Sequence, residues 1–336
     1  MFESCRAHFS RALPRPSHAR RRLWLGSGGY SGFVKICSLV PAATEVLFAL
    51  GLGEQVVGVT HECDWPPEAS LRPAITASLI DTDELSSAEI DGAVADAAGE
   101  GRALYAVDAE RWTEIGAEVI VAQELCDVCA VSTDDARSIV SAQKAEAEVL
   151  DFSPSTLDGI FESIRGLGRR FGAEAAADEL TALMQARLDR VHGALAEVAT
   201  SPRVFVSEWL EPPYAAGHWV PDMVQAARGT DVAGTSGWPS HRMRWTDVAA
   251  LRPEVVILAP CGFDLDRTIS EVMPLELSAH LLGTPAREEG KIFAVDANAY
   301  FSRPGPRTID GVELLAYLLH SDAYSDPGVP WSRVRV

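Results

Sequence analysis

The fold is decided by residues 35–60, which read KICSLVPAATEVLFALGLGEQVVGVT. The apolar run over 36–40 predicts a short buried strand, and Pro41 directly after it suits the first position of a helix. The apolar residues of 44–50 continue this helix until two nearby glycines end it. The β-branched run over 55–60 then predicts a second strand. A strand, a helix and a strand in this order indicate a βαβ unit and a parallel sheet.

The alternation of strands and helices continues through the rest of the chain. Short apolar runs predict further strands at 119–122, 148–152, 203–207, 255–259 and 291–295. Helices are predicted at 86–98 and 130–147, from about 264, and at 307–319. Between them lies a long stretch of helix formers with apolar residues at helical spacing, at 154–198. We therefore expect an α/β fold of two lobes with mostly parallel sheets, joined by a helical segment.

Composition and charge exclude several classes of function. The chain has 336 residues, 47% of them hydrophobic, and a formal net charge of -19. This excess of acid argues against a nucleic acid partner, because the backbone phosphates would be repelled. No apolar run approaches the roughly 20 residues that a membrane span needs, so we expect none. The charge is uneven, with about +5 in residues 1–34 and about -24 in the remainder.

The composition of the basic tail and the pattern of the cysteines indicate the compartment in which we expect the protein. A secretory signal needs an apolar stretch of about 7 to 15 residues after its positive start, but here only 23–25 is apolar before the Gly-Ser-Gly-Gly of 26–29. The six cysteines do not form the pattern of a disulfide scaffold, which fits a reducing compartment. We therefore expect a cytoplasmic protein with a disordered tail. A periplasmic or an organellar location is the alternative.

The local motifs of common enzymes are missing from the sequence. It has no G-x-x-x-x-G-K-[ST] phosphate loop, no H-E-x-x-H and no G-x-S-x-G. No two of the eight histidines stand four residues apart. These absences do not exclude an enzyme, but nothing in the sequence requires one, and an enzyme that reuses the scaffold stays an alternative.

Aromatic, acidic and thiol residues follow the predicted strands. Open α/β sheets bind ligands at the carboxyl ends of their strands. The residues there include His61 to Pro67, Gln123 to Cys129, Glu208 to Tyr214 with His218 and Trp219 beyond, Pro260 to Asp264, and Asp296 to Arg303. Each aromatic residue alone is also explained as a core residue. Together they predict a cleft for a large, partly apolar ligand with polar edges.

Cysteines at three of these strand ends leave a metal site open as an alternative. Cys126 and Cys129 have the spacing of half a zinc site or of a redox pair, and buried inert thiols are the other interpretation. If the lobes face each other, they could converge with His61, Cys63 and Cys261 on a transition metal or a metal chelate.

Several of these segments resemble a known family. Ser38 to Glu45, Leu50 to Gly53, Val56 to Thr60 and the Pro-rich turn after Trp65 resemble the first lobe of the periplasmic vitamin B12-binding proteins of ABC importers. Pro212 to Tyr214, Trp245 to Val256 and Phe301 to Arg307 resemble the second lobe of these class III, helical-backbone substrate-binding proteins. The resemblance covers about residues 35–320.

The resemblance implies two Rossmann-like lobes bridged by a single long α-helix. The implied boundaries are a basic tail at 1–34, an N-terminal lobe at 35–153, a helical linker at 154–200, a C-terminal lobe at 201–320 and a C-terminal tail at 321–336. It also implies a monomer that holds cobalamin or a related corrinoid in the cleft, without catalysis. The residues expected at the ligand are Pro41, Trp65, Glu124, Tyr214, His218, Trp219, Trp238, Phe301 and Arg303.

The chain also departs from these carriers. The thiols and His61, which could be an axial cobalt ligand, stand where the family has no such groups. An ABC permease is the implied protein partner, since acidic residues of the family dock on it. Glu110 stands near one such place, and the second reads Thr246-Asp247.

Overall fold

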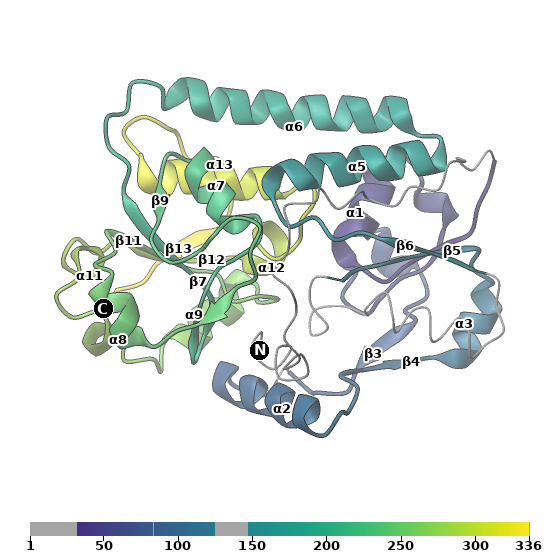
Figure 1. Ribbon diagram of the computed structural model, residues 1–336, viewed down its shortest axis with the longest axis horizontal. Coiled ribbons are helices and arrows are strands. Elements are labelled where there is room, and N and C mark those ends of the chain that lie inside the picture. Colours follow the sequence, from purple (N-terminus) through teal and green to yellow (C-terminus); the bar gives the residue numbers. More distant parts are fainter. Residues whose placement is uncertain (1–31, 83, 125–146, 336) are drawn as a thin grey trace, which may run out of the picture. The chain divides into compact units, whose positions relative to one another are not determined.

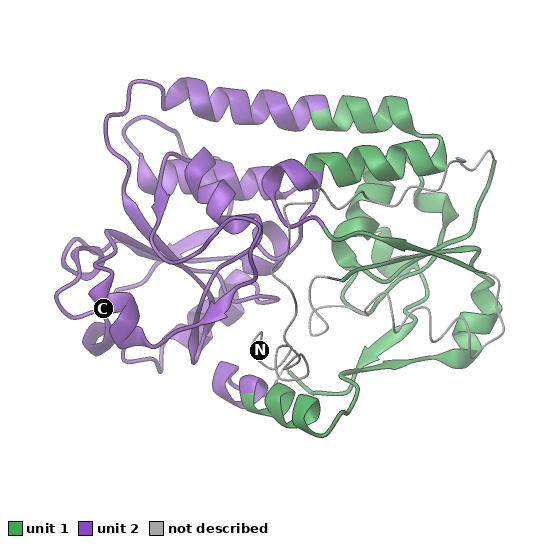
Figure 2. Ribbon diagram, in the orientation of Figure 1, with its two compact units in different colours: residues 1–84, 92–153, 161–181 green, residues 85–91, 154–160, 182–336 purple. Residues whose placement is uncertain are grey.

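A computed structural model describes residues 32–82, 84–124 and 147–335 (Figure 1). The chain divides into two compact units (Figure 2). Unit 1 consists of residues 1–84, 92–153 and 161–181, and unit 2 of residues 85–91, 154–160 and 182–336. The expected tail at 1–34 and helix at 130–147 lie almost wholly outside the described residues. Neither unit is continuous in the sequence, unlike the predicted lobes.

Unit 1 is built on a four-stranded parallel sheet in the order β2-β1-β5-β6. Its strands are β1 (Ile36–Ser38), β2 (Val56–Gly58), β5 (Val119–Ala122) and β6 (Glu148–Asp151). The helices α1 (Pro41–Ala49) and α3 (Ala109–Ile115) connect them, and β3 (Thr76–Ser78) pairs with β4 (Tyr105–Val107) in a separate antiparallel ribbon. The predicted βαβ start is therefore confirmed, with Pro41 at the first turn of α1.

Unit 2 contains a mixed seven-stranded sheet in the order β10-β8-β7-β11-β12-β13, with β9 also paired to β7. The predicted strands β7 (Arg203–Leu210), β11 (Val255–Leu258) and β12 (Ile292–Val295) form its parallel centre. The strands that the sequence did not indicate extend this centre: β8 (Pro213–Ala215), β9 (Thr230–Asp231), β10 (His241–Arg242) and β13 (Trp331–Arg333). Because β13 pairs with β12, the expected C-terminal tail contributes an edge strand.

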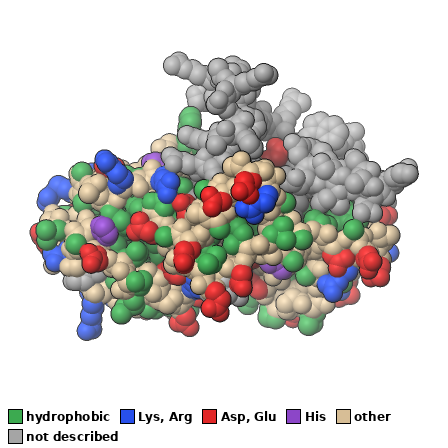
Figure 3. All heavy atoms as spheres, turned by 90° about the horizontal axis from the view of Figure 1, so that it is seen from below, with side chains coloured by type: hydrophobic (Ala, Val, Ile, Leu, Met, Phe, Trp, Pro, Cys, Tyr) green, Lys and Arg blue, Asp and Glu red, His purple; other side chains and the backbone are tan. Residues whose placement is uncertain are grey.

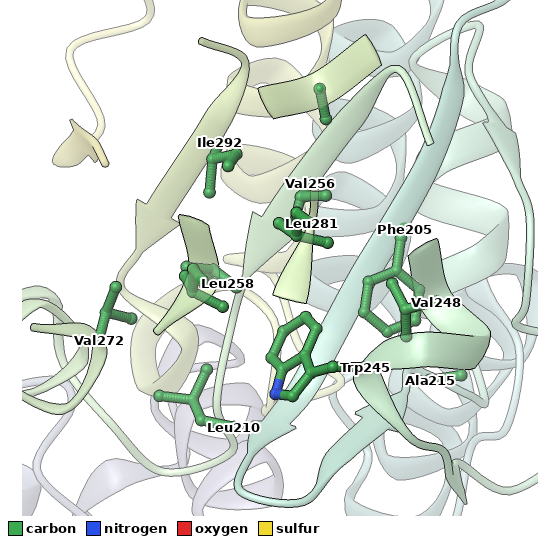
Figure 4. Packing of buried hydrophobic residues seen from close by; sticks show 12 residues of the cluster. Phe205, Leu210, Ala215, Trp245, Val248, Val256, Leu258, Val272, Leu281 and Ile292 are labelled. Carbon is green, nitrogen blue, oxygen red and sulfur yellow. The ribbon is translucent and has the colours of Figure 1, made fainter. Parts of the chain in front are cut away.

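The core of unit 2 explains why these strands sit where they do (Figure 4). Phe205, Val256 and Ile292 from the three central strands are fully buried in one cluster. Trp245 and Val248 of α8 (Trp245–Ala250) pack in the same cluster. Alternate residues of the parallel strands thus face an apolar layer, and the strand ends are left for polar groups. The remaining helices of unit 2 are α7 (Val220–Ala226), α9 (Leu265–Val272), α10 (Leu277–His280), α11 (Pro285–Glu288), α12 (Ala297–Tyr300) and α13 (Thr308–Leu319).

The helical stretch expected at 154–198 contains two helices, α5 (Leu157–Phe171) and α6 (Glu174–Ala194). Gly172 has a φ of +67°, a left-handed conformation that favours glycine. The N–H of Ala173 donates to the carbonyl of Gly168 at 2.8 Å, which is the hydrogen bond of a Schellman motif. The chain then turns, and Gly168 lies so near Ala177 that a Cβ on Gly168 would be 2.5 Å from the Ala177 methyl. The prediction of two α/β lobes with a helical connection is confirmed.

Candidate functional site

The ends of the parallel strands in unit 2 bring three chain segments together. Because β7, β11 and β12 are parallel, the segments that follow them meet at one edge of the sheet. The N–H of Cys261 donates to the carbonyl of Glu208 at 2.9 Å, and the N–H of Asn298 donates to the carbonyl of Phe263 at 3.0 Å. The N–H of Gly262 also donates to Ser302 Oγ at 3.3 Å. This strand-end edge is therefore one connected surface, as the sequence predicted.

Three carboxylates lie at this edge. Asp264 caps α9 by accepting from the N–H of Arg267, and Asp296 caps α12 by accepting from the N–H of Ala299. Burial raises the pKa of Asp296, and the charge of Asp264 raises it further, while the hydrogen bond from Ala299 opposes both effects. Glu208 adds a third carboxylate, whose Oε2 accepts from the N–H of Gly217 at 3.1 Å.

The cations near this edge are engaged by neighbouring groups. Arg303 is buried, and its guanidinium donates to Asn298 Oδ1 at 2.9 Å. Arg307 lies over the Tyr300 ring, with 5.9 Å between the guanidinium carbon and the ring centroid. The positive charges of both arginines lower the pKa of Asp296. The edge can therefore offer carboxylate acceptors together with a few fixed donors.

Four predicted aromatic or histidine residues lie together in unit 2. The indole N–H of Trp219 donates to the carbonyl of Phe301 at 2.9 Å, and the His218 ring centroid is 5.8 Å from that of Trp219. The N–H of His218 donates to the carbonyl of Trp238 at 2.6 Å. Trp219 and Phe301 are buried, whereas Trp238 is 57% exposed. Trp238 is thus the member of this group with a face open to solvent.

A close backbone approach holds this aromatic group in place. A Cβ on Gly217 would lie 2.3 Å from Ser240 N and 2.5 Å from the carbonyl oxygen of Trp238, so only glycine fits. His218 has a φ of 53°, which is rare for a residue with a side chain. Such a conformation persists only where the surrounding structure enforces it.

Tyr214 lies inside unit 2 instead of on its surface. The residue is 1% exposed, and its hydroxyl donates to Asp91 Oδ1 at 3.3 Å. Arg242 donates to the other oxygen of the same carboxylate at 2.9 Å. Trp209, which the sequence did not single out, is buried beside it and donates to the carbonyl of Ser87 at 3.1 Å. Only its place on a predicted strand end could have indicated Trp209.

The predicted ligand residues of unit 1 follow the ends of its parallel strands. Pro41 is half-buried at the start of α1, directly after β1. Trp65 is 45% exposed, and the peptide bond from Trp65 to Pro66 is cis. The N–H of Glu124 donates to Ser153 Oγ at 2.7 Å, which fixes the backbone after β5.

The residues nominated for a metal have other neighbours. His61 Nδ1 is 2.9 Å from Thr76 Oγ1, and its Nε2 is 3.4 Å from Glu62 Oε1. Cys63 is buried, with Sγ 3.1 Å from Thr44 Oγ1. Cys261 belongs to unit 2, and Cys126 and Cys129 lie outside the described residues. Within the described ranges, no three His, Cys, Asp or Glu side chains are grouped so that they could hold a metal ion.

The surface agrees with the acidic composition. Figure 3 shows one face on which acidic side chains are scattered among hydrophobic and basic ones. In the part of the chain that is described, no helix has the length and apolar character needed to cross a membrane.

Comparison with known proteins identifies the family. The profile of the periplasmic binding protein family matches residues 119–299, more than half of the chain. A cobalamin-binding protein of Halobacterium salinarum is 23% identical over 85% of this chain and 69% of its own. An uncharacterized ABC transporter substrate-binding lipoprotein of Bacillus subtilis is 23% identical over 87% of this chain and 82% of its own.

Solved structures show the same fold. The periplasmic vitamin B12-binding protein of Vibrio cholerae superposes with a TM-score of 0.63 at 19% identity, covering 86% of this chain and 97% of its own. A periplasmic heme-binding protein of Pseudomonas aeruginosa gives 0.68 at 17% identity, covering 90% and 99%. At these identities the likeness concerns the fold.

These findings correct one expectation and confirm two others. The expected cytoplasmic location is wrong, because the matching family is one of periplasmic proteins and one sequence relative is a lipoprotein, which points to a periplasmic or extracellular place. The expected resemblance and the expected non-catalytic role are confirmed, since the relatives are solute-binding proteins. The chain belongs to the periplasmic binding protein family.

Proposed function

We propose that this protein binds cobalamin or a related corrinoid as the solute-binding component of an ABC importer. The observation that carries the proposal is the link between an exposed indole and the strand-end edge of unit 2. The carbonyl of Trp238 accepts from the N–H of His218, and the N–H of the preceding Gly217 donates to Glu208 of that edge. The relative from Halobacterium salinarum is named a cobalamin-binding protein, which supports the same ligand class.

The charge of the edge favours a corrinoid over a heme. A heme carries two carboxylate side chains, which would face the carboxylates of Glu208, Asp264 and Asp296. Like charges brought close in a partly buried site raise the free energy of binding. A corrin ring instead carries carboxamide side chains, whose N–H groups donate to carboxylates and whose oxygens accept from arginine.

The expected ligand residues divide by exposure. Trp65 in unit 1 and Trp238 in unit 2 are exposed and offer flat apolar area at a low cost in side-chain entropy. Pro41, Glu124 and Arg303 offer an apolar ring, a carboxylate and planar donors. Tyr214, His218, Trp219 and Phe301 are buried and would act by holding the exposed groups in place.

The proposal is tested by titrating the purified protein with aquocobalamin and following its visible spectrum and the heat of binding. Trp238→Ala is expected to weaken binding by about 10-fold to 100-fold, because a flat ring that stacks on an aromatic side chain contributes about 1–3 kcal/mol to binding. Met273→Ala is the control, since Met273 is another exposed apolar residue of unit 2, outside the edge. Absence of saturable binding at micromolar ligand would overturn the proposal.

A further inference from the structure

The imidazole of His61 is held by side chains from two other strands of unit 1. His61 follows β2, at the edge of the parallel sheet where its strands end. The strands β3 and β4, which α2 (Ser87–Gly99) separates in the sequence, provide its neighbours. His61 Nδ1 is 2.9 Å from Thr76 Oγ1 of β3, and the His61 ring centroid is 5.6 Å from that of Tyr105 of β4. The orientation of the ring is therefore set by contacts within unit 1.

The loop that carries His61 is anchored by the residues next to it. Thr60 is buried, and it accepts from the N–H of Glu62 with Oγ1 at 3.2 Å and from the N–H of Cys63 with its carbonyl at 3.2 Å. Cys63 Sγ is 3.2 Å from Thr60 Oγ1 and 3.1 Å from Thr44 Oγ1 of α1. The buried thiol of Cys63 therefore anchors the loop on α1, and the imidazole is held on a fixed backbone.

Thr76 can fix the tautomer of His61 that a metal requires. A neutral imidazole has a proton on one nitrogen and a lone pair on the other. When Nδ1 holds the proton, it donates to Thr76 Oγ1, which also accepts from the backbone N–H of His61 at 3.4 Å, and the lone pair is then on Nε2. Metal-binding histidines almost always have such a second hydrogen bond to an oxygen of the protein. The pair of His61 and Thr76 therefore has the arrangement of a metal ligand and its support.

The other nitrogen of the ring is accessible to a ligand. Nε2 is 3.4 Å from Glu62 Oε1, and the two side chains are 25% and 48% exposed. An exposed pair of this kind contributes little to stability, so a metal can displace Glu62 from Nε2. Trp65 lies on the same loop and is 45% exposed. The loop therefore offers an imidazole nitrogen and an indole to a flat ligand with a metal at its centre.

We propose that His61 binds the cobalt of the corrinoid through Nε2 and replaces an exchangeable water as an axial ligand, with Thr76 as the positioning residue. This inference rests on the proposed function. In aquocobalamin the lone pair of Nε2 forms the Co–N bond, the Co–O bond breaks, and the water leaves with its electron pair. The cobalt stays Co(III), and a neutral imidazole has no proton to lose. Imidazole nitrogen is a common ligand of transition metals.

The test compares aquocobalamin with cyanocobalamin, whose cyanide does not exchange for an imidazole. Wild-type protein is expected to change the visible spectrum of aquocobalamin to that of aquocobalamin mixed with free imidazole. In His61→Gln the bound aquocobalamin is expected to keep its own spectrum. The ratio of the two Kd values removes the contacts that both cobalamins share, and His61→Gln is expected to lower the preference for aquocobalamin.

Two further variants separate the ligand from its support. Thr76→Val keeps the shape of the side chain and removes the oxygen beside Nδ1, so it is expected to weaken aquocobalamin binding by about tenfold, and His61→Gln by more. His192→Gln is the matched control, because His192 is an exposed histidine of α6, away from the strand ends. It is expected to leave the spectrum and the ratio of the two Kd values as in the wild type.

The outcomes distinguish this inference from the proposed function. If the wild type binds both cobalamins and the spectrum of aquocobalamin does not change, the axial ligand is overturned and the proposed function stands. A His61→Gln protein that still gives the wild-type spectrum, or that loses both cobalamins equally, would also overturn it, since His61 would then have no contact with the cobalt. A wild type that binds neither cobalamin would overturn the proposed function and this inference together.

Discussion

Replacing Gly217 with alanine tests the close approach that holds the aromatic group. The new Cβ would lie 2.3 Å from Ser240 N and 2.5 Å from both the Pro239 carbonyl carbon and the Trp238 carbonyl oxygen. All three are backbone atoms, so the whole segment 238–240 has to move away from Gly217. Overpacking of this kind costs about 1–3 kcal/mol.

The same displacement breaks two backbone hydrogen bonds. These join His218 N–H to the Trp238 carbonyl at 2.6 Å and Gly237 N–H to the His218 carbonyl at 3.0 Å. Each contributes about 1 kcal/mol, so the total loss of stability is about 3–5 kcal/mol. For a domain of this size that corresponds to a fall in Tm of roughly 10 °C.

The assay is thermal and urea unfolding followed by far-UV circular dichroism. Gly193→Ala is the matched control, because Gly193 lies in α6 with no atom within 4 Å of its added Cβ. It is expected to leave stability unchanged or to raise it by up to about 1 kcal/mol. A Gly217→Ala protein that melts within a degree or two of the wild type would refute the packing described for this group.

Two further predictions concern buried charge in unit 2. Asp231 accepts from the N–H groups of Ala233 and Gly234 with Oδ1, its Oδ2 has no hydrogen-bond partner among the described residues, and burial raises its pKa. Because the pKa of Asp231 is raised in the folded state, its contribution to stability is present below about pH 4 and is lost as the pH rises. The free energy of unfolding of Asp231→Asn is therefore expected to exceed that of the wild type by about 1 kcal/mol at pH 7 and by less at pH 4. Urea unfolding at both pH values measures the difference. No pH dependence of that difference would count against a strained carboxylate. Arg187 donates to Glu313 at 2.6 Å and to Asp310 at 2.7 Å, so Arg187→Ala is expected to lower the free energy of unfolding by about 1–3 kcal/mol, a value already discounted for the partial exposure of this pair. Arg190 is 3.8 Å from Glu313, so Arg190→Ala is the control and is expected to cost little. Equal losses in the two variants would contradict this.

The parallel centre of each unit was readable from the sequence because its strands are continuous apolar runs. Val255 to Leu258 and Ile292 to Val295 are buried on both faces, which is the pattern that predicts a central parallel strand. The edge strands β9 and β10 have only two residues each, too short for any periodicity. The break between α5 and α6 falls at Gly172, which is in a left-handed conformation; the glycines of this stretch indicated an interruption, but not which of them makes the turn.

The site was predicted as a set of strand ends and not as a set of contacts. Phe301 and Arg303 follow β12, as the parallel order of the strands indicated, whereas Trp238 was expected only from the family resemblance. The burial of Tyr214 against Asp91 could not be predicted, because the two residues are more than 120 positions apart in the chain and no local pattern reports such a pairing. The cytoplasmic location failed for a different reason, since it depended on the composition of the tail, whereas the family match depends on the sequence of residues 119–299.

The most direct test of the proposed function compares two ligands that differ in the charge they would bring to the strand-end edge. Isothermal titration of one protein preparation with cyanocobalamin and, separately, with hemin compares a ligand with amide edges to one with two carboxylates. The account predicts saturable one-site binding of cyanocobalamin at micromolar or lower Kd, and hemin binding at least about tenfold weaker. Tighter binding of hemin, or no binding of cyanocobalamin, would contradict it.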